Sequence, residues 1–78
     1  MGVDNTKVEF YGWQKGVRKI RFIMLLHEKG GISLRESKII KDKVIGGNEI
    51  ICYDFKVSSL AKEIHIESIK LGVKSRLV

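Results

Sequence analysis

The chain has 78 residues, 44% of them hydrophobic and 31% charged, which is the composition of an ordinary small globular domain. We expect residues 1–78 to form a single domain, with residues 1–6 frayed and no room for a separate catalytic unit. No apolar run approaches the roughly 20 residues that a membrane-spanning helix requires, and the first residues lack the apolar segment of a signal peptide. These features favour a cytoplasmic protein without membrane contacts.

Fifteen Lys and Arg residues against nine Asp and Glu give a net charge of +6 and a sequence pI near 9.7. Such a charge attracts acidic proteins, RNA and anionic surfaces over long distances. Because the basic residues are spread along the chain, they are also typical of a solvated surface. The single cysteine, Cys52, excludes an internal disulfide and fits a reducing compartment, and we expect it to be a small buried hydrophobe in a strand.

Three segments have the residue pattern of β-strands. Residues 7–13 alternate between apolar and polar side chains, with Val8 and Phe10 on the apolar side, as in a half-buried strand. Residues 49–53 (EIICY) form a short β-prone run, and residues 73–78 alternate again. We expect a strand at each place.

The most apolar segment, residues 17–29, predicts a helix that ends at Gly30 and Gly31, where a left-handed conformation costs least. At 100° per residue, its apolar side chains divide between two sides of the helix. One side packs inward, and the other requires a partner. The inward group is Phe22, Leu25 and Leu26, and the outward group is Ile20, Ile23, Met24 and His27.

The second helix has a clear start signal. Ser33 and Glu36 fit a capping box, in which the serine oxygen accepts the Glu36 amide proton and the carboxylate reaches back to the Ser33 amide. The helix therefore begins at about residue 34, and the glycine-rich segment 46–48 ends it. Its expected buried side chains are Leu34, Ile39, Ile40 and Val44.

The third helix is expected over residues 58–71, and Gly72 ends it. Residues 63–67 also alternate between apolar and polar side chains, which leaves a strand as the alternative there. Ile66 and Ile69 fall outside the core stripe and are a second candidate dimer contact. The stripe consists of Leu60, Ala61, Ile64, Ser68 and Leu71.

The expected order of elements is therefore β-α-α-β-α-β. Three helices on one face of a small, mainly antiparallel sheet form an α+β domain of two layers. No internal repeat or low-complexity segment interrupts this order.

No residue pattern for catalysis or metal binding is present. Cys52, Asp54 and His65 are the residue types of a thiol triad, but nothing in the sequence directs His65 toward the other two. The two histidines lie 38 positions apart and, with one cysteine, match no zinc spacing. The glycine pairs at 30–31 and 46–47 lie in no phosphate-binding motif, and helix termination explains both. We expect no enzyme activity, no metal and no cofactor.

The outward side of the first helix predicts a protein-binding surface, because an apolar centre with a polar rim is typical of interfaces. The expected partner is one protein, and the chain is expected to be a monomer or a weak homodimer. The alternative is that another element of the fold or a second subunit covers this side. The expected anchors are Ile20, Ile23 and Met24, and the expected rim is Lys19, His27 and Lys38.

A nucleic-acid contact is the alternative from another class. Basic side chains gather near the start of the first helix, with Tyr11 and Trp13 nearby as stacking surfaces for bases. Positive charge at a helix N-terminus opposes the helix dipole, which favours a role for these charges in binding. They are Lys15, Arg18, Lys19 and Arg21.

The segment 19–42, KIRFIMLLHEKGGISLRESKIIKD, resembles the C-terminal domain of the bacterial ribosomal stalk protein. Both have a helix-glycine-helix pattern, and residues 31–38 (GISLRESK) match the family's glycine turn, leucine and basic-glutamate-small-lysine sequence. The likeness extends in pattern from about residue 8 to residue 78. It implies the same α+β fold, which a protease adaptor that binds peptide N-termini also uses.

In the stalk family, the first helix and the start of the second recruit translation factors. Of the six expected contact residues, Met24 and His27 stand where the family carries basic side chains, so the resemblance implies a less basic face and a different partner. Such a domain suits a small bacterial or phage protein that binds and blocks one target. One version is an immunity protein (antitoxin) that neutralises a toxin, and another is a factor that binds the transcription or translation machinery.

Overall fold

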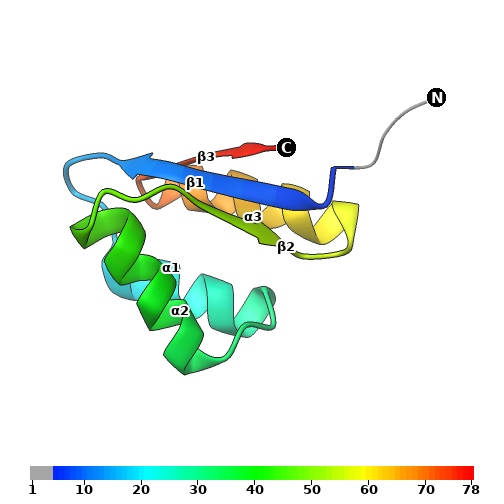
Figure 1. Ribbon diagram of the computed structural model, residues 1–78, viewed down its shortest axis with the longest axis horizontal. Helices are drawn as coiled ribbons and strands as arrows, with labels where there is room; N and C mark the ends of the chain where they lie inside the picture. The colour runs from blue at the N-terminus through cyan, green and yellow to red at the C-terminus, as the bar shows by residue number, and fades with distance from the viewer. Residues whose placement is uncertain (1–4) are drawn as a thin grey trace.

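The computed structural model describes residues 5–78 (Figure 1). The elements follow in the order β1 (Lys7–Trp13), α1 (Lys19–Met24), η1 (Leu25–Lys29), α2 (Leu34–Lys41), η2 (Asp42–Gly46), β2 (Ile51–Asp54), α3 (Ser58–Lys70) and β3 (Val73–Leu77). The π-helical segments η1 and η2 continue α1 and α2, so residues 5–78 contain three helices. The predicted α+β class and the predicted order β-α-α-β-α-β are confirmed.

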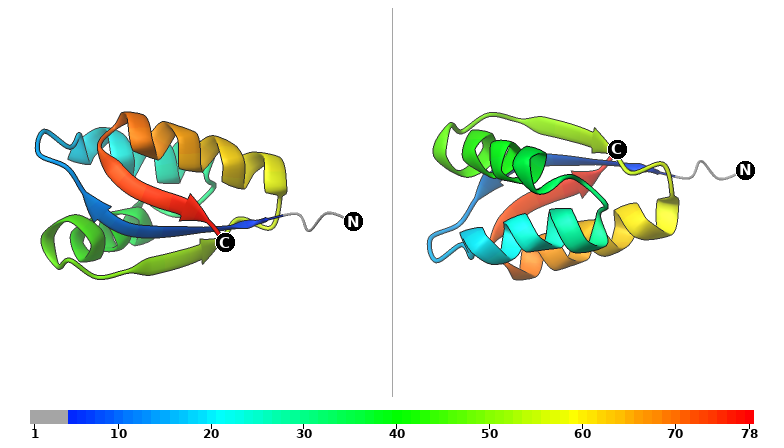
Figure 2. Two further views of the ribbon diagram at one scale, coloured as in Figure 1. Left: turned by 90° about the horizontal axis from the view of Figure 1, so that it is seen from above. Right: turned by 90° about the horizontal axis from the view of Figure 1, so that it is seen from below.

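The sheet has the strand order β2-β1-β3, and both pairings are antiparallel. Views from above and below show the helices on one face of the sheet, while the other face is open (Figure 2). Val8 and Phe10 of β1 point toward the helices and are fully buried, whereas Tyr11 is exposed. The predicted alternation of this strand is therefore confirmed.

The core lies between the sheet and the helices. The ring of Phe10 on β1 meets the ring of Phe22 on α1 edge to face, with centroids 5.3 Å apart, which is a favoured geometry for aromatic pairs. The predicted core stripe of α3 is confirmed, with Ala61, Ile64 and Ser68 buried, so the alternative of a strand at 63–67 is wrong. Leu26 of η1, Val44 of η2 and Val73 of β3 complete the fully buried group.

The turn between the first two helices follows the signals in the sequence. Ser33 Oγ accepts a hydrogen bond from the Glu36 amide at 3.1 Å, as the capping box predicts. Gly31 takes the left-handed conformation, with φ +74°, and lets the Ile32 amide donate to the Leu26 carbonyl oxygen at 3.1 Å. This bond closes the end of the helix and leads the chain directly into α2.

Two boundaries differ from the prediction. The first helix begins at Lys19, two residues late, because Arg18 has a non-helical backbone (φ −93°, ψ 89°), and its amide donates to the Leu71 carbonyl oxygen at the end of α3. The predicted fraying of residues 1–6 is wrong at Thr6, whose carbonyl oxygen accepts the Phe55 amide at 2.9 Å, and residues 1–4 lie outside the described chain.

Cys52 is exposed, so the prediction that it is a buried hydrophobe is wrong. Its neighbours Ile51 and Tyr53 pair with the buried residues Phe10 and Val8 of β1. Because cross-strand partners share one face of a sheet, Ile51 and Tyr53 face the helices and Cys52 faces outward.

The second helix is covered along one side only. Ser37 and Ile40 of α2 are buried, whereas Leu34 and Ile39 are exposed, so the prediction that Leu34 and Ile39 lie in the core is wrong.

Within residues 5–78, no helix combines the length and apolar character that crossing a bilayer requires.

Candidate functional site

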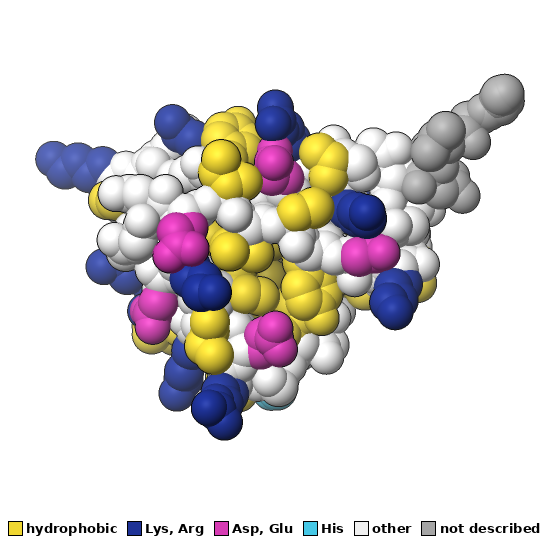
Figure 3. Space-filling view, in the orientation of Figure 1, with side chains coloured by type: hydrophobic (Ala, Val, Ile, Leu, Met, Phe, Trp, Pro, Cys, Tyr) yellow, Lys and Arg dark blue, Asp and Glu magenta, His cyan; other side chains and the backbone are white. Residues whose placement is uncertain are grey.

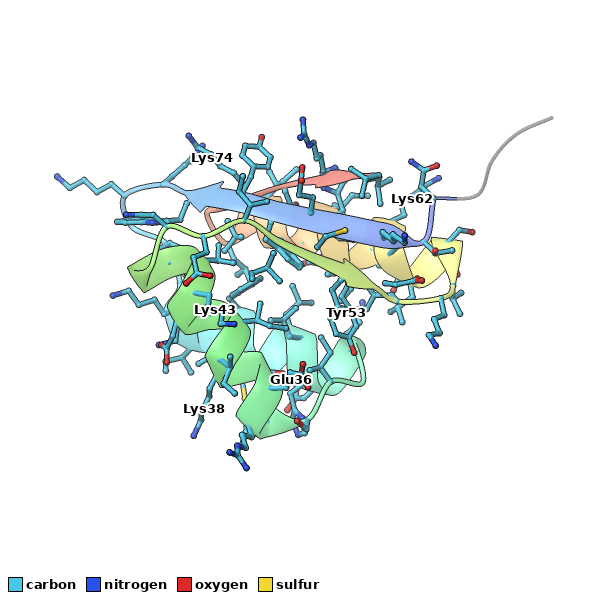
Figure 4. The ribbon with its side chains drawn as sticks, in the orientation of Figure 1. Glu36, Lys38, Lys43, Tyr53, Lys62 and Lys74 are labelled. Atoms are coloured by element: carbon cyan, nitrogen blue, oxygen red, sulfur yellow. The ribbon has the colours of Figure 1, made fainter. Side chains whose placement is uncertain are left out.

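The first helix carries an apolar side chain that the fold leaves in water. Ile20 is 71% exposed, more than any other large hydrophobic side chain of residues 5–78, and Met24, one turn later, is 36% exposed. The rim residues Lys19 and Lys38 are exposed too. Lys38 projects from α2 away from the sheet (Figure 4). These four side chains are positioned to contact another molecule.

Ile23 does not belong to this surface, because it is only 5% exposed. After the glycine turn, α2 folds back and packs against α1. Ser37 on α2 is fully buried, and so small a side chain lets the two helices approach closely. The prediction of Ile23 as an exposed anchor is therefore wrong, and the apolar centre is reduced to Ile20 and Met24.

His27 has a bond inside the fold. Its Nδ1 atom lies 2.8 Å from the carbonyl oxygen of Ile32, which can only accept, so Nδ1 carries the proton and donates. The half-buried ring thus ties η1 to the loop before α2. His27 therefore helps to shape the glycine turn.

A groove of about 410 Å³ runs between the first helix and α3, which lie side by side in the view from below (Figure 2). Met24 and Leu25 line it from the first helix, and Leu71 lines it from α3. Arg21 and Glu28 also line the groove, and neither takes part in an ion pair with another described residue. The sequence pattern missed this groove, since helical periodicity says nothing about which distant helix packs beside α1.

Contacts at both ends hold the walls of this groove together. Lys29 of η1 forms an ion pair with Glu63 of α3 at 3.3 Å, and the Arg18 amide donates to the Leu71 carbonyl oxygen at 2.9 Å. On the α3 wall, Glu67 pairs with Lys70 at 3.4 Å. The groove is therefore a preformed feature of the fold.

Apolar side chains also reach the surface away from α1. Ile39 on α2 and Ile50 before β2 are exposed. In the space-filling view, hydrophobic atoms are visible between the sheet and α2 (Figure 3), on the side where Tyr53 lies (Figure 4). A test of the first helix therefore needs control substitutions at the other exposed isoleucines.

The predicted nucleic-acid contacts are accessible, but their aromatic neighbours are partly engaged. Trp13 Nε1 donates to Asn48 Oδ1 at 3.1 Å, and the guanidinium carbon of Arg76 lies 5.6 Å from the centroid of the Tyr11 ring, covering one of its faces. The basic residues Lys15, Arg18, Lys19 and Arg21 are all exposed, and none forms an ion pair within residues 5–78.

The residues considered for a thiol triad have structural partners. His65 Nδ1 lies 2.9 Å from Ser75 Oγ, and Asp54 Oδ1 accepts the Lys56 amide at 2.8 Å. That backbone bond is the main reason that the pKa of Asp54 lies below its ordinary value. Among the described side chains, His, Cys, Asp and Glu form no group of three that could hold a metal ion.

No protein-family model, curated protein or solved structure matches this chain.

Proposed function

We propose that this chain is a non-enzymatic protein-interaction domain that binds one protein through the exposed side of α1 and modulates or inhibits it. The observation that carries the proposal is the exposure of Ile20, 71% of whose surface is open beside the partly exposed Met24. Removing apolar surface from water stabilises a complex by about 25 cal/mol per Å², and an apolar centre inside a charged rim is typical of interfaces.

The rim gives the partner its chemistry. Lys19 and Arg21 are the sequence neighbours of Ile20 on the helix and both are exposed, and Lys38 projects from α2. A basic rim favours an acidic surface that surrounds an apolar pocket. A bacterial toxin and a component of the transcription or translation machinery in the cytoplasm are the partner classes that we propose.

RNA binding is the second candidate, and one observation favours it. The basic residues of the segment 15–21 have no acidic partner within residues 5–78, although four ion pairs form elsewhere in the described chain. Unpaired basic side chains are free to contact phosphates without first breaking an internal bond.

The test is affinity capture from a lysate of the native host with four forms of the chain as bait. The forms are the wild type, Ile20→Asp, Ile66→Asp and the double variant Arg18→Glu with Lys19→Glu. Ile66 is an exposed isoleucine on α3. Ile66→Asp is therefore the matched control: it makes the same change of side chain as Ile20→Asp, but away from the first helix. Captured proteins are identified by mass spectrometry, and captured RNA by sequencing.

The proposal predicts one protein that the wild type and Ile66→Asp both capture and that Ile20→Asp loses by at least about 100-fold in affinity, as expected for an interface hot spot. Capture of RNA that survives Ile20→Asp and is lost in the Arg18 and Lys19 double variant would establish the second candidate instead. A protein captured equally by Ile20→Asp would show that the assigned face is wrong.

A further inference from the structure

The groove between the first helix and α3 has charges of opposite sign at its two ends. Arg21 and Glu28 both line it and lie seven residues apart, about 10 Å along a helix. The apolar part of the lining is Ile20, Met24 and Leu25 of the first helix and Leu71 at the end of α3, and the other two charged residues of the lining, Lys29 and Glu67, already have ion-pair partners in Glu63 and Lys70. A surface with an apolar middle and opposite charges at its ends is complementary to itself when it is turned by 180°.

We propose that this groove is occupied by the same groove of a second copy of the chain, in a two-fold dimer whose first helices run antiparallel. With the axis between Met24 and Leu25, Arg21 of each copy meets Glu28 of the other copy. Met24 of each copy meets Leu25 of the other copy at the centre. Each contact is made twice, as two-fold symmetry requires.

The remaining charges are compatible with this register. On the α3 wall of the groove, the carboxylate of Glu67 is already paired with Lys70 at 3.4 Å. In this register Ile20 lies opposite Lys29, whose ammonium group is already held by Glu63 at 3.3 Å. The aliphatic stem of Lys29 is left to cover Ile20. Two chains of charge +6 can therefore approach here without stacking like charges.

The groove favours a helix over an extended segment. Both of its walls are helices, whose backbone groups are paired internally, so a strand lying between them would find no backbone hydrogen bonds. A helix satisfies its own backbone and needs only apolar side chains flanked by an acidic and a basic residue seven positions apart. The first helix of a second copy has this arrangement.

The dimer uses Ile20 and Met24, which the proposed partner protein also contacts, so the dimer and that complex exclude each other. The dimer rests on the groove and its charges alone. It does not depend on whether a different partner exists.

Sedimentation equilibrium of the full chain tests the dimer, at concentrations from 5 µM to 1 mM and at low salt. The wild type is expected to rise from 8.9 kDa toward twice that mass. Arg21→Glu and Glu28→Arg each place like charges together twice, and each is expected to weaken dimerisation at least about tenfold. The variant with both changes, and an equimolar mixture of the two single variants, restore opposite pairs and are expected to dimerise as the wild type does.

Lys62→Glu is the matched control, because Lys62 is an exposed residue of α3 outside the groove lining, and its reversal lowers the net charge as much as Arg21→Glu does. It is expected not to weaken the dimer, and circular dichroism confirms that every variant is folded. A wild type that stays at 8.9 kDa up to 1 mM would overturn the proposal and leave the groove to a helix of another protein. A dimer that resists both single reversals, or that the double reversal fails to restore, would overturn it equally.

Discussion

Ile20 and Ile23 lie three residues apart on the same helix, yet Ile20 is 71% exposed and Ile23 is 5% exposed. The second helix packs against α1, and the fold buries Ile23, while nothing in residues 5–78 covers Ile20. The apolar surface of α1 is therefore narrower than helical periodicity predicts. Its two exposed apolar side chains, Ile20 and Met24, also line the groove beside α3.

Alanine substitution at these two isoleucines separates the covered side of α1 from the exposed side. Ile23→Ala is expected to lower the free energy of unfolding by about 2–4 kcal/mol, because it leaves a cavity in a packed contact. Ile20→Ala is expected to change it by less than about 0.5 kcal/mol, as surface substitutions do. Urea denaturation at a concentration where the chain is monomeric measures both, and equal losses would contradict the assignment of the two sides.

The two glycines of the turn have different roles, and alanine at each position tests them. A Cβ atom at Gly30 would lie 2.6 Å from the Leu26 carbonyl oxygen and 3.0 Å from the Phe55 ring, so Gly30→Ala is expected to cost about 3 kcal/mol of stability. Gly31 has φ +74°, and apart from its two chain neighbours no atom of residues 5–78 would lie within 4 Å of such a Cβ, so Gly31→Ala is expected to cost about 1 kcal/mol of backbone strain. Thermal unfolding measures both losses of stability, and a larger loss for Gly31→Ala than for Gly30→Ala would contradict this description of the turn.

Two fully buried serines are expected to respond in opposite directions. Ser37 Oγ donates to the Ser33 carbonyl oxygen at 2.8 Å, so Ser37→Ala is expected to lower the free energy of unfolding by about 1 kcal/mol. Ser68 Oγ is buried without a hydrogen-bond partner among residues 5–78, so Ser68→Ala is expected to raise the free energy of unfolding by about 1 kcal/mol by removing a desolvated hydroxyl. Chemical denaturation of the two variants measures both changes, and destabilisation by Ser68→Ala would mean that its hydroxyl is satisfied in solution.

Asp54 is expected to make the stability of the fold depend on pH in the acidic range. The Lys56 amide bond lowers the pKa of this carboxyl in the folded state from the ordinary 3.8, so the folded protein binds its proton less readily than the unfolded chain. Its contribution is complete above the unfolded pKa and is lost as the pH falls through the folded pKa. Asp54→Asn is therefore expected to be less stable than the wild type at pH 7, with the difference shrinking below pH 4. A difference that stays constant from pH 7 to pH 2 would exclude this linkage.

The fold was predictable because local signals agreed with one another. The strand at residues 7–13 has a clean alternation, and the Ser33 capping box and Gly31 mark the two sides of one turn without reference to the rest of the chain. The stripe of α3 lies within one arc of a helix, and its burial follows directly. Each of these features depends on neighbours in the sequence.

The exposed surface was only partly predictable because it depends on long-range packing. In the run 49–53, both alternating sides are apolar, and only the pairing of Ile51 with Phe10 decides that Cys52 faces outward. In the same way, periodicity places Ile23 away from Phe22, but only the packing of distant elements around α1, such as α2, decides that Ile23 is buried. The groove beside α3 joins residues about 45 positions apart, such as Leu25 and Leu71, and no local pattern contains that contact.

The most direct test of the docking surface on α1 is methyl NMR of the isoleucine and methionine side chains during titration with the protein that affinity capture identifies. The exposed isoleucines Ile20, Ile39, Ile50, Ile66 and Ile69 report on separate parts of the surface. At a concentration where the chain is monomeric, the account predicts the largest shifts at the methyl groups of Ile20 and Met24. Largest shifts at Ile66 and Ile69, or at Ile39 and Ile50, would contradict it.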